Sequence, residues 1–200
     1  MLGNFFSPFN DNIPHNQTTG GMAPLISLAY LAFVNTRSSF IGTSTRGISR
    51  TTIMASQEAI SSLPPLKKYD GSAINTDKLS DILKGKRVAL YFAAGWCPMC
   101  TRFEPSLMKF QSAAASNGKD VEIIYVPSDP EDAIVKRTTA MKMMSVPFGE
   151  KADEIKTKYK IWSGSECGKL GTARRSGVPA LVVLDSKNGS ELAFIDAESR

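Results

Sequence analysis

The sequence predicts one α/β domain, a central sheet with helices on both faces, behind a disordered N-terminal leader. Beyond residue 58, short apolar runs alternate with segments whose apolar residues recur every three or four positions, which is typical of a sheet covered by helices. The first 57 residues carry one acid, three arginines and no lysine, and 14 of them are Ser or Thr. We therefore place a targeting leader at residues 1–57 and the folded domain at residues 58–200.

Composition excludes several classes of protein. A chain of 200 residues with 42% apolar and 22% charged residues is globular rather than fibrous. No apolar run reaches the roughly 18 residues of a membrane-spanning helix. The single histidine, His15, lies in the leader, so the domain lacks Ser-His-Asp or Cys-His nucleophiles and the usual zinc ligands. A net charge of +5 does not by itself indicate a nucleic-acid partner, and we expect no nucleic acid, metal, cofactor or stable membrane insertion.

The leader leaves the compartment open. Its composition favours a transit peptide for a mitochondrion or plastid. Residues 22–34 (MAPLISLAYLAFV) have the length of a signal-peptide core but lack the basic flank that normally precedes one. Secretion is therefore an alternative, and so is initiation at Met54, which would leave the protein in the cytoplasm or nucleus.

The first elements of the domain are read from turn and cap signals. An extended segment at residues 66–69 precedes the turn Asp70-Gly71. Thr76 is expected to cap a helix that ends near Gly85. Residues 87–94 (RVALYFAA) form a run typical of a strand buried on both faces. A helix then extends to about Ala115, with an apolar stripe made by Cys100, Phe103, Leu107, Phe110 and Ala114, and Pro105 should kink it.

The second half continues the alternation. Residues 121–126 form another buried strand, and residues 128–131 (SDPE) predict a capping box that starts a helix at about Pro130. A further helix is expected over residues 151–159, after a break at Val146-Pro147-Phe148. Residues 162–176 are rich in Gly and Ser and indicate a loop. Two strands follow, at residues 180–184 and 191–195, joined by a turn at residues 187–189.

The motif with chemical meaning is Trp96-Cys97-Pro98-Met99-Cys100, which follows a buried strand and opens a helix. Two cysteines three positions apart can close a small disulfide ring and reopen it. Cys97 falls at the helix cap, where free N–H groups and the helix dipole favour a thiolate. Cys100 lies on the apolar stripe and should be a protected thiol. We expect Cys97 to attack a partner's disulfide and Cys100 to release the product.

Three other interpretations of these cysteines were weighed. Zinc needs four ligands, and the domain offers only Cys97, Cys100 and Cys167. A structural disulfide would close a ring of four residues and stabilise the fold little. Chance occurrence on a core helix is the third. Trp96 is expected to shield the reactive sulfur and to give partners a flat apolar docking surface.

These residues resemble the thioredoxin superfamily, and most closely its tryparedoxin and nucleoredoxin branch. The likeness rests on residues 90–100 (LYFAAGWCPMC) and on residues 177–185 (GVPALVVLD), and it extends over about residues 66–196. It implies a thioredoxin-like fold with a mixed sheet. By this resemblance Pro179 is cis and lies against Cys97, and the backbone of Val178 pairs with an extended substrate. Pro98 and Trp96 complete the implied substrate-binding residues.

The chain departs from that pattern at four places. Met99 stands where the branch usually has a second proline, which leaves the reduction potential open. Tyr91 occupies the position of thioredoxin's buried aspartate, so the base that activates Cys100 is unidentified. An insertion at about residues 163–175 carries Cys167. The C-terminal helix that the family adds after its last strand is apparently missing.

Weaker signals have two interpretations each. Arg174 and Arg175 precede the substrate-facing strand and are either selectors of acidic partners or solvated loop charges. Cys167 is either a regulatory thiol or an incidental surface cysteine. Met141, Met143 and Met144 are either packing residues or an adaptable docking surface.

The predicted function is a monomeric thiol-disulfide oxidoreductase that reduces protein disulfides, with those of peroxidases as candidate targets. It would draw electrons from an upstream thiol reductant and need no cofactor beyond its own dithiol. One alternative within this chemistry is a disulfide isomerase or oxidase of the secretory pathway. Another class is a redox-sensing interaction protein of nucleoredoxin type that turns over little.

Overall fold

A computed structural model of the chain describes residues 63–185 and 188–198. The predicted leader lies outside these residues. Within the described residues the first bridge is made by Lys67, and the helices and strands are α3 (Thr76–Leu83), β1 (Arg87–Ala93), α4 (Pro98–Ser116), β2 (Val121–Pro127), α5 (Glu131–Met141), β3 (Met144–Ser145), α6 (Glu150–Tyr159), η1 (Gly164–Glu166), α7 (Cys167–Leu170), β4 (Ala180–Leu184) and β5 (Glu191–Asp196). No helix among the described residues is both long and apolar enough to span a membrane.

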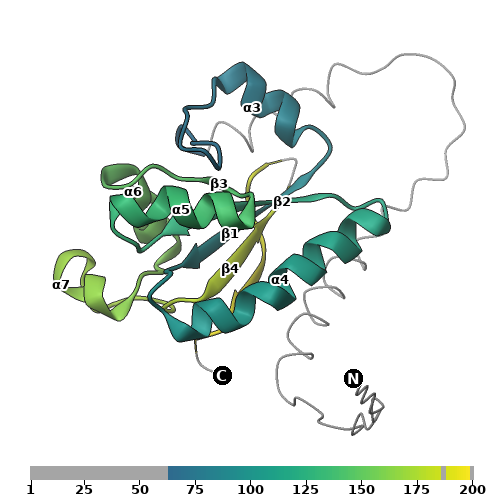
Figure 1. Cartoon of the computed structure of the whole chain (residues 1–200). Helices are drawn as coiled ribbons and strands as arrows, with labels where there is room; N and C mark the ends of the chain where they lie inside the picture. Colours follow the sequence, from purple (N-terminus) through teal and green to yellow (C-terminus); the bar gives the residue numbers. More distant parts are fainter. Residues whose placement is uncertain (1–62, 186–187, 199–200) are drawn as a thin grey trace, which may run out of the picture.

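The described strands form one mixed sheet in the order β3-β2-β1-β4-β5 (Figure 1). β1 pairs in parallel with β2, and β2 pairs in parallel with β3. β4 runs antiparallel to both β1 and β5. The central strand β1 is buried on both faces, as its apolar run predicts, and it leads directly into the cysteine motif at the start of α4.

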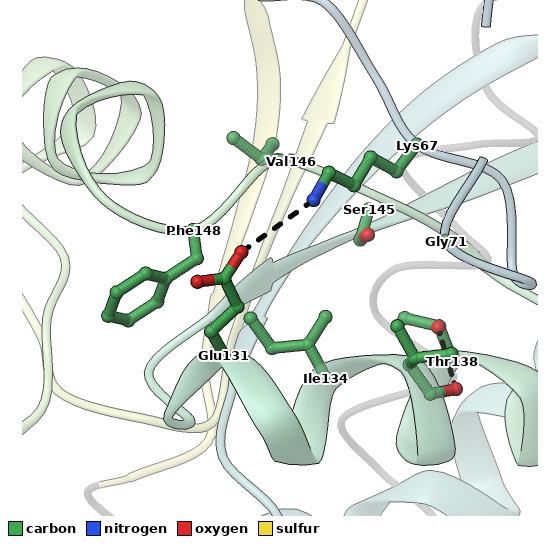
Figure 2. A pocket seen from close by; sticks show the side chains of 9 residues that line it. Lys67, Gly71, Glu131, Ile134, Thr138, Ser145, Val146 and Phe148 are labelled. Carbon is green, nitrogen blue, oxygen red and sulfur yellow. Dashed lines mark hydrogen bonds and ion pairs between the residues drawn. The ribbon is translucent and has the colours of Figure 1, made fainter. Parts of the chain in front are cut away.

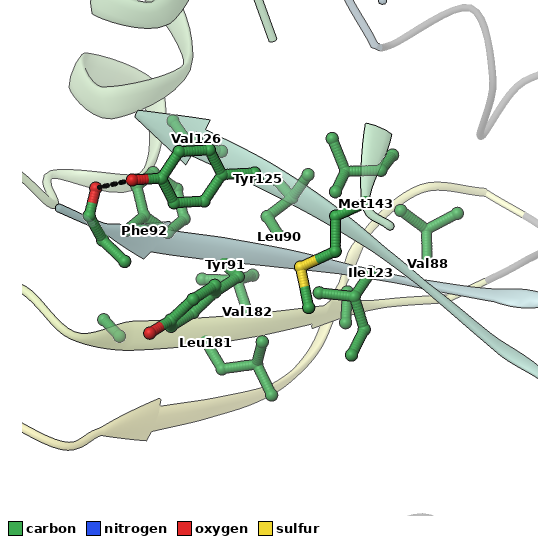
Figure 3. Packing of buried hydrophobic residues seen from close by; sticks show 14 of the residues in the cluster. Val88, Leu90, Tyr91, Phe92, Ile123, Tyr125, Val126, Met143, Leu181 and Val182 are labelled. Carbon is green, nitrogen blue, oxygen red and sulfur yellow. Dashed lines mark hydrogen bonds between the residues drawn. The ribbon is translucent and has the colours of Figure 1, made fainter. Parts of the chain in front are cut away.

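Helices cover both faces of this sheet. Tyr91 and Tyr125 are neighbours in the β1–β2 register, with ring centroids 6.0 Å apart, and Figure 3 shows both in the core. Phe103 of α4 packs 6.0 Å from the Tyr91 ring. Phe92, the next residue along β1, instead meets Tyr159 of α6 at 6.1 Å. Because successive side chains of a strand point to opposite faces, α4 and α6 lie on opposite sides of the sheet, and the predicted architecture is confirmed.

The apolar stripe of α4 is confirmed residue by residue. Its buried side chains are Cys100, Phe103, Leu107, Phe110 and Ala114. A stripe of this size, covered by the sheet, contributes most of the stability of a helix in a small domain. Pro105 lies inside the helix and leaves the stripe intact.

Two predicted helix starts are wrong. Asn75, not Thr76, caps α3, because its side chain accepts a hydrogen bond from the N–H of Asp77. The capping box expected at residues 128–131 does not form: Pro130 is the N-cap of α5 and has no side-chain hydrogen bond. Ser128 and Asp129 instead bind distant residues, described below. The extended segment at residues 66–69 is reduced to bridges made by Lys67.

The loop expected over residues 162–176 contains two short helices, η1 and α7, and is tied to the domain along its length. Ser163 and Glu166 form a capping box at the start of η1. Arg174 pairs with Glu198, and Arg175 pairs with Glu191 of β5. The short Ser and Gly residues here serve tight turns and caps rather than a solvated loop.

Candidate active site

Cys97 is the N-cap of α4, as predicted. Its sulfur accepts a hydrogen bond from the Cys100 N–H at 3.4 Å, and Pro98 occupies the first turn, where a missing N–H costs nothing. The side chain is buried, with 7% of its surface exposed. The Cys100 N–H and the N-terminal end of α4 therefore face this sulfur.

Cys100 is one turn further along α4 and has no exposed surface. The Ala94 N–H lies 3.5 Å from its sulfur. Burial raises the pKa of the Cys100 thiol well above its ordinary value, and the nearby Cys97 adds to this rise. The two thiols differ in position as predicted: Cys97 is at the start of α4, whereas Cys100 is fully buried one turn further along.

The Val178–Pro179 peptide bond is cis, which confirms the expectation from the family resemblance. The Val178 carbonyl oxygen lies 3.7 Å from the Cys97 sulfur, and the contact joins residues 81 positions apart. The fold thus brings together five of the predicted site residues on two elements: Cys97, Pro98 and Cys100 at the start of α4, and Val178 and Pro179 before β4.

Trp96, the sixth predicted site residue, stands beside Cys97 with 53% of its surface exposed. Its indole Nε1 donates a hydrogen bond to the Ser128 carbonyl at 3.2 Å. The neighbouring Gly95 N–H donates to the Asp129 carboxylate at 2.6 Å. The two residues that follow β2 therefore hold the two residues that precede Cys97.

A partly buried charged network lies under the motif, and the sequence patterns did not reveal it. Arg137 of α5 is ion-paired with Glu104 of α4 and lies 3.8 Å from the Asp129 carboxylate. Tyr125 donates its hydroxyl to Asp129. The one sequence signal was Glu104, an acid one turn after Cys100, but its partner on α5 is 33 positions away.

Tyr91, which stands at the position of thioredoxin's aspartate, connects this network to the motif. Its hydroxyl lies 3.3 Å from the Cys100 carbonyl oxygen and 3.4 Å from the Glu104 carboxylate. Burial raises the pKa of the Glu104 carboxyl above its ordinary value, against the opposing effect of Arg137. The nearest ionisable acid to the motif along this path is thus Glu104 rather than an aspartate on β1.

An open pocket of about 360 Å³ is lined by Gly95, Glu104, Asp129 and Arg137, together with other residues of α5. Gly95 lies close to the end of the Arg137 side chain: a Cβ atom there would lie 2.9 Å from Nη1 of Arg137. This is tighter than real Cβ contacts, so any other residue at position 95 would displace the guanidinium.

Arg174 and Arg175 are paired with acids rather than free in a solvated loop. Arg174 pairs with Glu198, whose carboxylate also accepts a hydrogen bond from the Gly177 N–H at 2.7 Å, beside Val178 of the site. Arg175 pairs with Glu191 of β5 and stacks on Phe194 at 3.7 Å. Cys167 begins α7 and is half-buried. Within residues 63–185 and 188–198 the three cysteines are free thiols, and no group of His, Cys, Asp and Glu has the arrangement of a metal site.

A second, smaller pocket lies between α5 and β3, at the edge of the sheet (Figure 2). Its volume is about 70 Å³. Lys67 and Glu131 approach across it at 3.9 Å, and Phe148 stands at its side. It contains no cysteine, so we assign it no part in redox chemistry.

A C-x-x-C pair at a helix start, facing a cis-proline before a strand, defines a dithiol protein of the thioredoxin superfamily. The Thioredoxin-like family model matches residues 85–191, more than half of the chain. The chain therefore belongs to the thioredoxin-like family, and the predicted family is confirmed.

The relatives fall in the nucleoredoxin and tryparedoxin branch. The chain is 34% identical over 124 residues to probable nucleoredoxin 2 of Oryza sativa subsp. japonica, covering 62% of this chain and 28% of that protein. It is 28% identical to nucleoredoxin of Bos taurus, covering 60% of this chain and 24% of that one. The chain thus spans about a quarter of the length of these nucleoredoxins.

Solved structures show the same fold. Tryparedoxin II of Crithidia fasciculata superposes with a TM-score of 0.53 at 21% identity, over 73% of this chain and 86% of that one. Native tryparedoxin I of the same organism gives 0.50 at 23% identity, over 72% and 87%. Family and relatives together support thiol oxidoreductase chemistry in general.

Proposed function

We propose that the chain is a protein-disulfide reductase that works by dithiol–disulfide exchange through Cys97 and Cys100. The observation that carries this proposal is the asymmetry of the two thiols. Cys97 caps α4 next to the Val178 carbonyl, whereas Cys100 is fully buried one turn behind it. One sulfur is placed to meet a partner and the other to finish the exchange.

The proposed reaction has two steps. The Cys97 thiolate attacks a sulfur of the target disulfide, a mixed disulfide forms, and the first target thiolate leaves and takes up a proton. Cys100 then loses its proton and attacks the Cys97 sulfur, which forms the Cys97–Cys100 disulfide and releases the second target thiolate. Two electrons pass to the target. The first target thiolate takes its proton from solvent, the second takes the proton lost by Cys100, and an external thiol reductant restores the dithiol.

Target binding is proposed to use the surface around Cys97. Trp96 and Pro98 are exposed there, and the Val178–Pro179 segment lies across the sulfur. An extended peptide could bond to the Val178 backbone while its disulfide meets Cys97. Protein disulfides, including those of peroxidases, are the proposed targets of a monomeric carrier.

Reduction of insulin by dithiothreitol tests the proposal. The full chain should accelerate it, Cys97→Ser should abolish the acceleration, and Cys167→Ser should retain it. Slow turnover in the wild-type chain, combined with tight binding to partners in only one oxidation state, would instead indicate a redox sensor. Equal rates for wild type and Cys97→Ser would refute the reductase, and partner binding that is the same in both oxidation states would refute the sensor as well.

The Cys100→Ser variant identifies the partners. Without the second thiol, the mixed disulfide at Cys97 should persist and allow targets and the upstream reductant to be isolated as covalent adducts. The adducts should disappear on treatment with excess thiol and be absent from the Cys97→Ser,Cys100→Ser double variant. Adducts that survive loss of Cys97 would contradict the assignment of the attacking sulfur.

We further propose that residues 1–57 direct the protein to a mitochondrion or plastid. The support is compositional: one acid, three arginines and 14 hydroxylated residues. A fusion of residues 1–57 to a fluorescent protein should enter the organelle. A fusion found in the secretory pathway, or diffuse in the cytoplasm, would overturn the proposal.

A further inference from the structure

Trp96 is the largest exposed apolar side chain next to Cys97, and a hydrogen bond to Ser128 holds it in place. Half of its surface is exposed, and its indole N–H has a hydrogen-bond partner in the Ser128 carbonyl at 3.2 Å. An exposed indole without such an anchor samples several rotamers. The position of Ser128 therefore decides the orientation of Trp96.

Ser128 is itself fixed from two sides. Its N–H donates to the Ala93 carbonyl at 2.9 Å, which continues the β1–β2 pairing by one residue. Its hydroxyl donates to the Glu166 carboxylate at 2.7 Å, across 38 positions of the chain. The second contact connects the residue that holds Trp96 to the segment at residues 163–175, and Figure 1 shows α7 of that segment at the same end of the molecule as the start of α4.

Glu166 is a rigid anchor. One carboxylate oxygen pairs with Lys156 of α6, a lysine whose side chain is almost fully buried. The other oxygen accepts from the Ser163 N–H at 2.9 Å and from the Ser163 hydroxyl at 2.7 Å, besides Ser128. With four donors from three segments, the carboxylate has little freedom to move.

From these contacts we propose that Glu166 is a positioning residue: acting through Ser128, it holds Trp96 in the orientation that receives a protein disulfide. The inference rests on the proposed reductase function and deepens it. The segment at residues 163–175 thereby contributes to substrate choice without touching the thiols. It favours partners large enough to cover the indole over small disulfides that reach Cys97 alone.

The expected effect is on binding rather than on chemistry. A partner that docks on a fixed indole avoids ordering that side chain on association. Loss of the Ser128–Glu166 bond should raise KM for a protein disulfide about three- to tenfold, the range for one hydrogen bond. The value of kcat, and kcat/KM for hydroxyethyl disulfide, should change less than about twofold.

Ser128→Ala in the full chain is the test variant, because it removes the hydroxyl and leaves the carbonyl that receives the indole. Ser163→Ala is the matched control: it also removes one hydroxyl from the same Glu166 oxygen, but it leaves the connection to Ser128 intact. Ser128→Thr keeps a hydroxyl and should restore the wild-type KM for insulin.

A spectroscopic readout does not depend on activity. The chain has two tryptophans, and Trp162 is 3% exposed, so acrylamide quenching reports chiefly on Trp96. The quenching constant should increase in Ser128→Ala and remain unchanged in Ser163→Ala. In a Trp96→Phe background, which lacks the indole N–H, Ser128→Ala should have no further effect on KM.

Three results would overturn the inference: equal KM values for Ser128→Ala and wild type, an equal rise in Ser163→Ala, or an equal loss with hydroxyethyl disulfide. These outcomes are distinct from failure of the proposed function. In that case the wild-type chain would not accelerate reduction of either disulfide, whereas quenching would still test whether Glu166 and Ser128 hold Trp96.

Discussion

Two half-buried carboxylates near the cysteine motif have nearly the same exposure and pKa values shifted in opposite directions. The side chain of Glu104 is 19% exposed and that of Glu166 is 20% exposed. Burial raises the pKa of Glu104 above its ordinary value. Burial acts in the same direction on Glu166, but Lys156 and the hydroxyls of Ser128 and Ser163 outweigh it, and the pKa of Glu166 is lowered.

The difference lies in the partners of each acid. Glu104 shares the single guanidinium of Arg137 with Asp129, and its other contact, to the Tyr91 hydroxyl, is long at 3.4 Å. Glu166 has its own lysine and three further donors. The comparison teaches that burial alone does not set the direction of an acid's pKa shift, because unshared hydrogen-bond donors and cations can outweigh it.

The two networks meet at adjacent residues. Asp129 belongs to the network of Arg137 and holds the Gly95 N–H, whereas Ser128 belongs to the network of Glu166 and holds the Trp96 indole. Each network therefore fixes one of the two residues before Cys97. A substitution can therefore be assigned to one network or the other by whether it loosens Gly95 or Trp96.

The largest effect is expected for Arg137→Met. It leaves Glu104 and Asp129 without their shared cation, and removing one partner of a buried pair costs about 3 kcal/mol of unfolding free energy at pH 7. The loss should be smaller at pH 5, because acids deprived of a cation bind protons more readily. Urea unfolding of the wild type and the variant at both pH values measures this.

Arg102→Met is the control for that substitution. Arg102 is exposed, and its contact is with the Pro98 carbonyl, so its loss should change stability by less than about 0.5 kcal/mol. A cost below about 1 kcal/mol for Arg137→Met, or the same cost at both pH values, would show that the network is not buried as described.

A smaller effect is expected for Lys156→Met, about 1 to 2 kcal/mol at pH 7. Methionine fills the volume of the lysine stem, and Glu166 keeps the donors from Ser128 and Ser163. Chemical unfolding measures this change in unfolding free energy. The control is Lys169→Met, which breaks the pair of the exposed Lys169 with Asp153 and should leave the unfolding free energy unaltered. A cost equal to that of Arg137→Met would remove the distinction between the two networks.

The smallest effect expected is the change with pH of the contributions that Glu104 and Glu166 make to stability, and these two changes have opposite signs. The raised pKa of Glu104 means that the folded state binds this proton more tightly than the unfolded chain, so the contribution of Glu104 to stability improves as pH falls from 7 towards its ordinary value of 4.5. The contribution of Glu166, whose pKa is lowered, is complete above 4.5 and is lost as pH falls below it.

Glu104→Gln and Glu166→Gln isolate these contributions. The difference in unfolding free energy between wild type and variant, followed from pH 7 to 3.5, should rise on acidification for Glu104 and fall for Glu166. The sign of each change is the measured outcome, because a raised pKa and a lowered pKa give stability opposite dependences on pH. Changes of the same sign would contradict the assignment.

The features predicted from the sequence are those set by local pattern. The stripe from Cys100 to Ala114 follows from helical spacing, and β1 follows from its apolar run. The motif residues also lie where a C-x-x-C at a helix start requires. The cis bond at Pro179 was accessible through family resemblance alone, because no local pattern distinguishes it from a trans proline.

What could not be predicted depends on long-range polar contacts. Ser128 and Asp129 have the composition of a helix cap, but their side chains find Glu166 and Arg137 instead. Arg174 and Arg175 face acids that come after β4 in the sequence. A polar side chain satisfies its hydrogen bonds with whichever partner the fold brings near, and one sequence does not show which partner that is.

The close approach of Gly95 to Arg137 has a consequence for how this chain can diverge. Any side chain at position 95 would occupy the space of the guanidinium, so the two positions, 42 residues apart, are expected to vary together in descendants. A side chain gained at position 95 would have to be met by a shift of the guanidinium, or by a shorter residue at position 137 together with another way to neutralise Glu104 and Asp129. Substitution of Gly95 is thus constrained by Arg137 of α5, which lines the same pocket.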